Sequence, residues 1–295
     1  ERWNDVMSEG GAPLDLSTFI GAMNADSICV DCTASQDVAD RYVEIAKKRV
    51  PIVAANKKAQ SGPLEQYEAL WRVLRESGSP FLYETNVGAA LPVIAVLKNL
   101  ARTGDRVEKI EAILSGTLSF IFNTFSTSDR SFSDIVREAK DKGYTEPDPR
   151  DDLSGMDVAR KAVILAREMG LKISVEDIPR APLLSNTSMN AESVEAFFHA
   201  LEAENELWNE RRAAARADGK VFRFIATIDQ SGARIALQAL DVSHPSYSMQ
   251  GSDNIIAFTT ARYCNTPLVI KGPGAGADVT AGGVFADILK LGIRN

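Results

Sequence analysis

Short apolar runs alternate with helix-like segments over the first third of the chain. The apolar runs cover residues 27–31, 50–54 and 81–84, and helical periodicity fills 36–48 and 64–76 between them. This alternation predicts right-handed crossover connections and therefore a parallel sheet. In such sheets ligands bind beyond the carboxyl ends of the strands.

Polar residues stand where these ligand sites are expected. Thr33 and Ser35 follow the first apolar run, and Asn56 and Lys57 follow the second. All four are candidates for contact with a ligand at the edge of the sheet. Lys57 also fits an ordinary surface lysine beside Lys58, and the residues alone leave that interpretation open.

The pattern changes after about residue 92. Helices are expected at 91–102, 117–126, 131–142, 191–217 and 277–291, and strands at 107–114, 221–229, 234–242, 254–263 and 267–271. The strands come in succession with turn residues between several of them, so they predict an antiparallel sheet with helices on one face. With 295 residues and 45% hydrophobic content, the chain is large enough for two cores.

The segment 143–161 is a proline-stiffened acidic loop that leads into a helix. Pro147 and Pro149 restrict the backbone and favour extended geometry before each of them, which predicts a semi-rigid strap. Ser154 is expected to be the N-cap of a helix that ends at Gly170.

Asp157 and Lys161 lie four residues apart on this expected helix, so their side chains share a face at the edge of its apolar stripe. Two structural interpretations compete with a functional one. Ser154 and Asp157 fit a capping box, and Asp157 and Lys161 fit a simple helix ion pair.

Composition excludes several functions. The net charge of −7 with scattered basic residues argues against nucleic-acid binding. No apolar run approaches the roughly 20 residues that span a bilayer, and the first residues do not read as a signal peptide, so no membrane association is expected. With two histidines, a histidine triad or multi-histidine metal site is disfavoured, and lysine and carboxylate chemistry remains.

Several segments together resemble homoserine dehydrogenases, especially those fused to an aspartokinase. They are Val-Asp-Cys-Thr-Ala-Ser at 30–35, Ala-Asn-Lys-Lys at 55–58, Tyr-Glu-Thr-Asn-Val-Gly-Ala-Ala-Leu-Pro at 83–92, Leu-Ser-Gly-Thr-Leu-Ser-Phe-Ile-Phe-Asn at 114–123, the acidic segment 143–161, and Gly-Pro-Gly-Ala-Gly-Ala-Asp-Val-Thr-Ala-Gly-Gly-Val at 272–284. The resemblance extends over nearly the whole chain.

The resemblance implies an α/β protein with an incomplete Rossmann-type parallel-sheet domain and an α+β catalytic and dimerisation domain. The first would comprise residues 1–92 with 272–295 packing back on it, and the second residues 93–271. The glycine-rich phosphate-binding turn of the family is expected before residue 1, so a truncated sheet is expected. NAD and NADP both stay open as coenzyme, because the residues that distinguish them are expected in that earlier part.

The implied reaction is reversible, NAD(P)H-dependent reduction of L-aspartate 4-semialdehyde to L-homoserine in the biosynthesis of threonine, methionine and isoleucine. By the match of motifs, Lys161 would be the catalytic proton donor, with Lys57 as its rival or as a second cation. Substrate would be bound by three carboxylates, those of Glu146, Asp152 and Asp157.

The resemblance also implies contacts for the cofactor and for a structural sodium ion. The cofactor-binding positions would be Thr33, Ser35, Asn56, Lys57, Gly143 and Gly276. The sodium positions would be Glu84, Val87, Ala89 and Leu91, acting mostly through backbone carbonyl oxygens, which suit hard cations.

The family pattern predicts a homodimer or larger homo-oligomer in the cytoplasm, or in a plastid if the protein is from a plant. Two alternatives stay open. The chain could be a noncatalytic dimerisation or regulatory fragment of such an enzyme, or a dehydrogenase of similar architecture that acts on another semialdehyde or amino acid.

Overall fold

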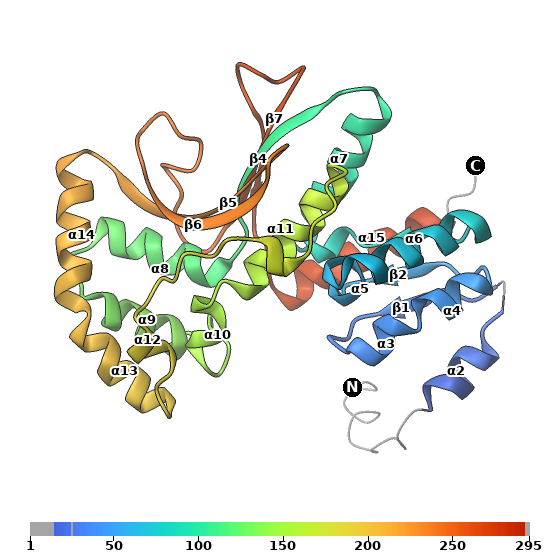
Figure 1. Ribbon diagram of the computed structural model, residues 1–295, viewed down its shortest axis with the longest axis horizontal. Helices are drawn as coiled ribbons and strands as arrows, with labels where there is room; N and C mark the ends of the chain where they lie inside the picture. The colour runs from blue at the N-terminus through green and yellow to red at the C-terminus, as the bar shows by residue number, and fades with distance from the viewer. Residues whose placement is uncertain (1–14, 25, 293–295) are drawn as a thin grey trace.

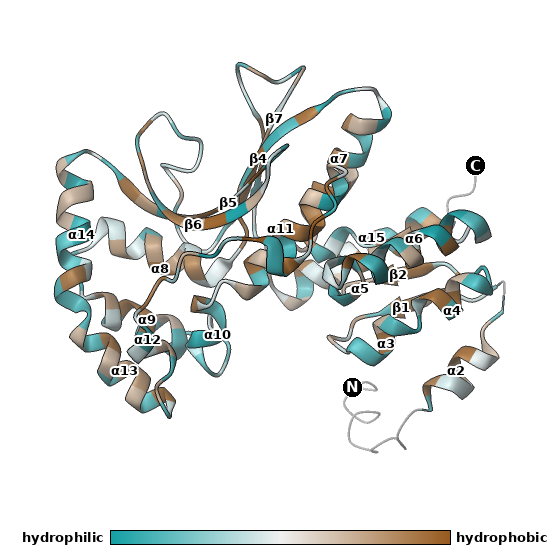
Figure 2. Cartoon of the chain, viewed as in Figure 1, coloured by the Kyte–Doolittle hydropathy of each residue, from teal (hydrophilic) through white to brown (hydrophobic). Residues whose placement is uncertain are grey.

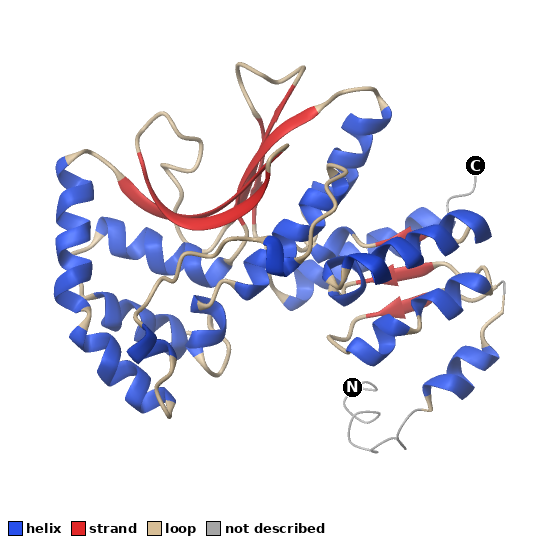
Figure 3. Cartoon of the chain, in the orientation of Figure 1, coloured by secondary structure: helices blue, strands red, loops and turns tan. Residues whose placement is uncertain are grey.

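The structure, a computed structural model, describes residues 15–24 and 26–292 and contains two sheets. One is a three-stranded parallel sheet in the order β1-β2-β3, and the other is a five-stranded antiparallel sheet in the order β6-β5-β4-β7-β8 (Figures 1 and 3). Both sheets confirm the predicted α/β class, with a parallel part followed by an α+β part.

The parallel part is built from short elements. They are α2 (Leu16–Ala22), β1 (Cys29–Asp31), α3 (Gln36–Asp40), α4 (Tyr42–Lys47), β2 (Ile52–Ala54), α5 (Lys58–Ser61), α6 (Leu64–Ser77), β3 (Phe81–Leu82) and the 3-10 turn η1 (Glu84–Asn86). All of β2 is buried, and Figure 2 shows its hydrophobic character. The helix predicted over 36–48 is divided at Arg41, whose amide bonds to the carbonyl of Val38, three residues back.

The second part follows with its helices packed on one face of the antiparallel sheet. Its first elements are α7 (Val93–Arg102), β4 (Val107–Ile113), α8 (Gly116–Thr127), α9 (Phe132–Asp141), α10 (Pro149–Leu153), α11 (Met156–Glu168), η2 (Val175–Asp177), α12 (Asn186–Met189), α13 (Val194–Ala203) and α14 (Asn205–Ala217). The strands β5 (Val221–Asp229), β6 (Gly232–Leu240), β7 (Asn254–Thr260) and β8 (Leu268–Gly272) come next, before α15 (Ala277–Gly292). The single helix predicted over 191–217 is two helices, α13 and α14, that meet at Glu204.

The segment before α11 differs from its prediction. Pro149 begins the short helix α10, because proline suits the first turn of a helix and Asp148 caps it by accepting from the Arg150 amide at 3.0 Å. Ser154 ends α10, and α11 starts after Gly155, which has a left-handed φ of 69°. The expected N-cap at Ser154 and its capping box are therefore wrong.

Helix α11 connects the two parts of the molecule. It contacts α5 and α7 on one side and β5 and β6 on the other, and Figure 1 shows it running between the two sheets. Burial from both sides explains why most of it is apolar, with Val158, Ala162 and Leu165 at the predicted spacing. Charged side chains on this helix thus lie beside both parts.

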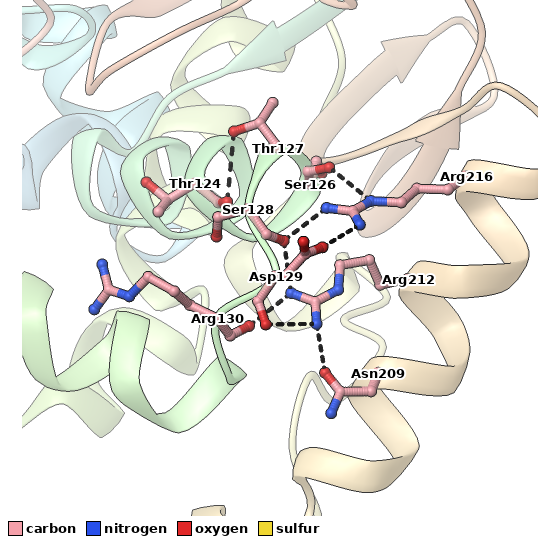
Figure 4. A network of polar contacts seen from close by, with 9 residues as sticks. All are labelled: Thr124, Ser126, Thr127, Ser128, Asp129, Arg130, Asn209, Arg212 and Arg216. Carbon is pink, nitrogen blue, oxygen red and sulfur yellow. Dashed lines mark hydrogen bonds and ion pairs between the residues drawn. The ribbon is translucent and has the colours of Figure 1, made fainter.

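Two arginines of α14 fix the loop after α8 (Figure 4). Arg212 donates to the carbonyls of Ser128 and Arg130 at 2.9 and 2.6 Å, and Arg216 donates to the Ser128 carbonyl and the Asp129 carboxylate at 2.6 Å each. The carbonyls at the end of a helix have no partner inside it, so these donors satisfy groups that would otherwise need water. They hold the far end of the buried helix α8 in place.

Helix α15 packs back on the parallel part, against β2 and η1. The close approach of α15 to this part depends on Gly283. A Cβ placed there would lie 2.5 Å from the Thr85 side chain and 3.1 Å from the Ala90 Cα. Helix α15 thus lies against β2 and η1 of the parallel part.

We expect Gly283→Ala to lower the free energy of unfolding by about 1–3 kcal/mol, the usual cost of forcing an extra methyl into a packed contact. Gly282→Ala is the matched control, because a Cβ at Gly282 meets nothing within 4 Å. That change should be neutral or stabilise the helix by about 0.5–1 kcal/mol. Urea denaturation of both variants measures the difference, and equal stabilities would show that α15 is not held by this contact.

Candidate functional site

A cavity of about 490 Å³ opens where the carboxyl ends of β1 and β2 face α10 and α11. Residues from both parts of the molecule line it: Thr33, Ala34, Ala55, Asn56, Lys57, Lys58, Glu146, Asp151, Asp152, Ser154, Met156, Asp157 and Arg160. It lies at the edge of the parallel sheet, where ligands were expected.

The Asp157 carboxylate, which lines this cavity, joins Lys57, which also lines it, to Lys161, which is buried behind it and is not among the lining residues. Lys161 Nζ lies 2.8 Å from Asp157 Oδ2 and also donates to the carbonyl of Leu114 at 2.7 Å. Lys57 Nζ, which comes from the end of β2, lies 3.7 Å from Asp157 Oδ1. Asp157 is not the cap of α11, since Gly155 occupies the N-cap position with no side-chain bond. The capping alternative is thus excluded, and the ion pair is part of a three-residue cluster.

The cluster is electrostatically asymmetric. Partial burial favours the neutral form of Asp157, but the charges of Lys161 and Lys57 outweigh this and lower its pKa to about 2. Burial, together with the neighbouring Lys161 charge, lowers the pKa of Lys57, although Asp157 opposes that shift. The carboxylate stays ionised at neutral pH and orders two ammonium groups around it.

The acidic loop places Glu146 and Asp152 in different environments. Asp152 accepts from the Glu146 amide at 2.8 Å and from Thr117 Oγ1 at 2.9 Å, and burial raises the pKa of Asp152. The exposed carboxylate of Glu146 makes no hydrogen bond or ion pair with any described residue. Asp152 therefore shapes the loop, while Glu146 is free to bind a ligand.

The strand-end residues are held by a buried aspartate that the sequence reasoning did not select. Asp31 accepts from the Thr33 amide at 2.7 Å, from the Tyr42 hydroxyl at 2.6 Å and from Asn56 Nδ2 at 2.9 Å. Asn56 also donates to the carbonyl of Ser35 at 2.8 Å. The signal that could have revealed Asp31 is a carboxylate inside an apolar strand, which must find hydrogen-bond partners when buried.

Gly143 and Gly276, two of the expected cofactor contacts, are not among the residues that line the cavity. Both have left-handed or related backbone conformations, with φ of 70° and 118°, that favour glycine. At Gly143 the reason is the end of α9, where its amide bonds to the carbonyl of Lys140 at 2.9 Å. The other members of the set, Thr33, Asn56 and Lys57, line the cavity, and Ser35 caps the next helix, α3.

The expected sodium positions form one tight turn before α7. The Glu84 carboxylate accepts from the amides of Ile94 and Ala95 at 2.7 and 3.0 Å, so it serves the first turn of that helix. The Leu91 carbonyl accepts from the Val93 amide at 2.8 Å, and Ala89 has a φ of 51°. No cluster of three or more His, Cys, Asp or Glu side chains suited to a metal occurs among the described residues, so any cation here would depend on carbonyl oxygens.

The arrangement also includes residues that the sequence did not single out. Thr117, in the first turn of α8, donates to Asp152, and Arg160 lines the cavity from the turn between Asp157 and Lys161. No helix among the residues with described structure has the length and apolar character needed to cross a membrane.

Comparisons with known proteins relate both parts of the chain to the same family. The family described as homoserine dehydrogenase matches residues 92–289, and that described as homoserine dehydrogenase, NAD binding domain, matches residues 1–84. The chain is 46% identical to the chloroplastic bifunctional aspartokinase/homoserine dehydrogenase 2 of Zea mays and 43% identical to the homoserine dehydrogenase of Schizosaccharomyces pombe. Each alignment covers 98% of this chain, but 32% of the maize protein and 80% of the yeast protein.

Solved structures show the same architecture. A Candida auris protein of unknown function has a TM-score of 0.91 at 39% identity, over 96% of this chain and 82% of that one. A putative homoserine dehydrogenase from Archaeoglobus fulgidus has a TM-score of 0.72 at 25% identity, over 90% of this chain and 74% of that one.

The parallel sheet and the site at its edge define a two-part α/β protein whose first part is a Rossmann-type, NAD-binding domain. Its second part supplies helix α11, which carries Asp157 and Lys161. The chain belongs to the homoserine dehydrogenase family.

Proposed function

We propose that this chain carries homoserine dehydrogenase activity, the reversible NAD(P)H-dependent interconversion of L-aspartate 4-semialdehyde and L-homoserine. The observation that carries the proposal is the cluster of Lys57, Asp157 and Lys161 at the carboxyl edge of the parallel sheet. In this cluster Lys161 would be the proton donor, Asp157 the carboxylate that holds it and Lys57 a second cation. The cluster lies where a dinucleotide-binding fold binds its ligands.

The nicotinamide cofactor, NAD or NADP, supplies or accepts the hydride when bound. Thr33, Ser35, Asn56 and Lys57 would hold it at the strand ends, with Gly143 and Gly276 contributing backbone contacts. The structure fits such a group because Asp31 already fixes the Thr33 amide and the Asn56 side chain, so the loops need little ordering on binding.

Proton transfer is the task of Lys161. Its Nζ lies between Asp157 and the Leu114 carbonyl, which orient its protons. In the reducing direction Lys161 gives a proton to the carbonyl oxygen that becomes the alcohol, and in the oxidising direction it removes that proton. Lys57 places a second positive charge beside the same oxygen and stabilises the charge that develops there.

Substrate recognition falls to the carboxylates. The substrate carries an α-ammonium group, and the free Glu146 side chain can pair with it. Asp157 orients the two lysines and contacts the substrate's polar groups. Asp152 contributes from the loop, whose shape it holds through Thr117 and the Glu146 amide.

A sodium ion in the turn with Glu84, Val87, Ala89 and Leu91 would be structural and would stiffen the entry into α7. We also propose that the chain works as a homodimer or larger homo-oligomer, in the cytoplasm or, in a plant, in a plastid. The maize relative is described as chloroplastic and bifunctional, and an aspartokinase part in this protein is proposed on that resemblance.

The test is oxidation of NADPH in the presence of L-aspartate 4-semialdehyde, followed by the absorbance of NADPH. It should be run on the chain and on a version extended at its N-terminus by a glycine-rich phosphate-binding turn, each beside its Lys161→Ala variant. Activity that depends on Lys161 supports the proposal. Inactivity of every folded form would instead favour a noncatalytic dimerisation or regulatory module.

Asp157→Asn tests whether the carboxylate does more than hold the helix. The amide keeps the shape but removes the charge that orders Lys57 and Lys161, so we expect kcat/KM for the semialdehyde to fall at least about 100-fold, equivalent to roughly 2.7 kcal/mol. Asp141→Asn, an exposed change at the end of α9, is the control and should leave the kinetics unaltered. A change in melting temperature with normal kinetics would limit Asp157 to a structural role.

A further inference from the structure

A second hollow lies on the parallel part, away from the candidate active site. A cavity of about 680 Å³ is lined by residues of α6, α7 and α15 beside β3. A neighbouring cavity of about 590 Å³ shares Trp71, Arg75, Tyr83 and Lys98 with it. We call the two together the α6–α7 groove. None of its lining residues lines the cavity at Lys57 and Asp157.

Some cationic side chains of the groove make no ion pair, whereas its carboxylates are engaged. Arg75, Lys98 and Arg102 line the larger cavity, and none of their side chains makes an ion pair or a hydrogen bond with a described residue. The carboxylates beside them are engaged, because Asp287 accepts from the Glu84 amide at 3.0 Å and from Lys290 at 2.8 Å. The Glu84 carboxylate is bonded to the first amides of α7.

The carboxylates of the neighbouring cavity are engaged as well. Glu168 accepts the hydroxyl proton of Tyr83, and Glu68 pairs with Lys172 at 2.8 Å. The hollow thus contains four cationic side chains that make no ion pair with a described residue, those of Arg72, Arg75, Lys98 and Arg102, beside carboxylates that are engaged. Such a hollow attracts anions.

An aromatic surface lies beneath the free cations. Lys98 Nζ lies 4.1 Å from the centre of the Tyr83 ring and 5.7 Å from that of Trp71. These rings stabilise the ammonium group only in part, and burial lowers the pKa of Lys98. The nearby carboxylates of Glu168, Glu84 and Asp287 oppose that shift without forming an ion pair with Lys98. A bound anion would pair with Lys98 directly, while Trp71, which is half-buried, would contact an apolar group.

We infer that the α6–α7 groove is a binding site for a small organic anion, a carboxylate or phosphate whose apolar part lies against Trp71. The cavity volumes fall in the range of about 300–1,000 Å³ that is usual for small-molecule sites. The anion would pair with Arg75, Lys98 and Arg102, which come from two helices that flank the edge strand β3. This site is independent of the dehydrogenase reaction proposed above.

Tryptophan fluorescence tests the inference directly. Trp208 is fully buried and does not line the groove, so its emission is a constant background, and in a Trp3→Phe variant a change on titration reports on Trp71. Phenyl phosphate, benzoate, inorganic phosphate and phenol should be titrated in turn. We expect saturable binding of phenyl phosphate or benzoate at least tenfold tighter than of phosphate or phenol, and the better of the two identifies the anionic group.

Variants of the lining residues test whether the anion binds in the α6–α7 groove. Arg75→Gln combined with Arg102→Gln should weaken binding at least tenfold, and Lys98→Met should do the same. Arg106→Gln is the control, because Arg106 is 74% exposed, pairs with Glu108 and does not line the groove. Lys57→Ala, in the other cavity, should leave the affinity unchanged. Absence of saturation, equal binding of phenol, or affinity that survives both groove variants would overturn the inference.

Discussion

Replacing Lys161 by alanine should lower turnover by about 10² to 10⁴, the usual contribution of a positioned acid or base. Lys161 is buried and held by Asp157 and the Leu114 carbonyl, so a water that replaces its ammonium group would lack both its proton and its position. Steady-state kinetics with the semialdehyde and NADPH measures the loss. KM for NADPH should change little, since the strand-end residues remain.

Three further variants make this result specific. Lys161→Arg keeps the charge but presents a guanidinium that does not release its proton, so it should be nearly as inactive as Lys161→Ala. Lys47→Ala, on the exposed side of α4, should be fully active. If Lys161→Ala keeps near-normal turnover and Lys57→Ala loses it, Lys57 is the proton donor and Lys161 a structural ion pair.

Replacing Arg167 by methionine should lower both stability and activity. Arg167 is buried at the end of α11, and its guanidinium donates to three carbonyls, those of Ile173 at 3.0 Å, Gln60 at 2.7 Å and Gly62 at 2.7 Å. Methionine would leave these acceptors without a donor. Because hydrogen bonds to charged groups are worth about 1.5–3 kcal/mol each, we expect a loss of at least about 3 kcal/mol in the free energy of unfolding.

The effect on activity follows from where those carbonyls lie. Gln60 and Gly62 belong to the turn that starts at Lys57, while Asp157 stands on the same helix as Arg167. Arg167 therefore fixes the turn of one lysine against the helix of the other. Loss of this contact should lower kcat about tenfold or more at temperatures where the variant is folded, because misplaced reacting groups are inefficient.

Urea denaturation and kinetics on the same samples check both effects. Arg234→Met is the control, since Arg234 is 54% exposed and pairs with Asp229 at 3.3 Å, an ion pair of the kind worth at most about 1 kcal/mol. A folded Arg167→Met enzyme with full activity would show that the contact stabilises the protein without positioning Lys57.

The sequence predicted which segments are helices and which are strands better than it predicted where each helix begins and ends. Apolar runs that alternate with helical segments predicted β1, β2 and β3. Burial on both faces explains the run of β2, whereas Val30 of β1 is exposed. The division of α13 from α14 at Glu204 could not be predicted from the sequence, because the residues on both sides of it keep helical periodicity. Ser154 satisfied the sequence rule for an N-cap, yet the left-handed Gly155 starts α11 and leaves Ser154 to end α10.

The sequence by itself determined the α/β class, with a parallel and an antiparallel sheet, since periodicity and family motifs are local properties of the chain. The same motifs supplied most of the candidate site residues, which stay predictions. The sequence also identified the spacing of Asp157 and Lys161, which a helix brings to one face. The tertiary structure decided that Lys57, 100 positions before Asp157, shares its carboxylate. It also assigned Asp31 and Arg167 to positioning roles and left Arg75, Lys98 and Arg102 without partners, because burial and pairing depend on segments that are distant in the chain.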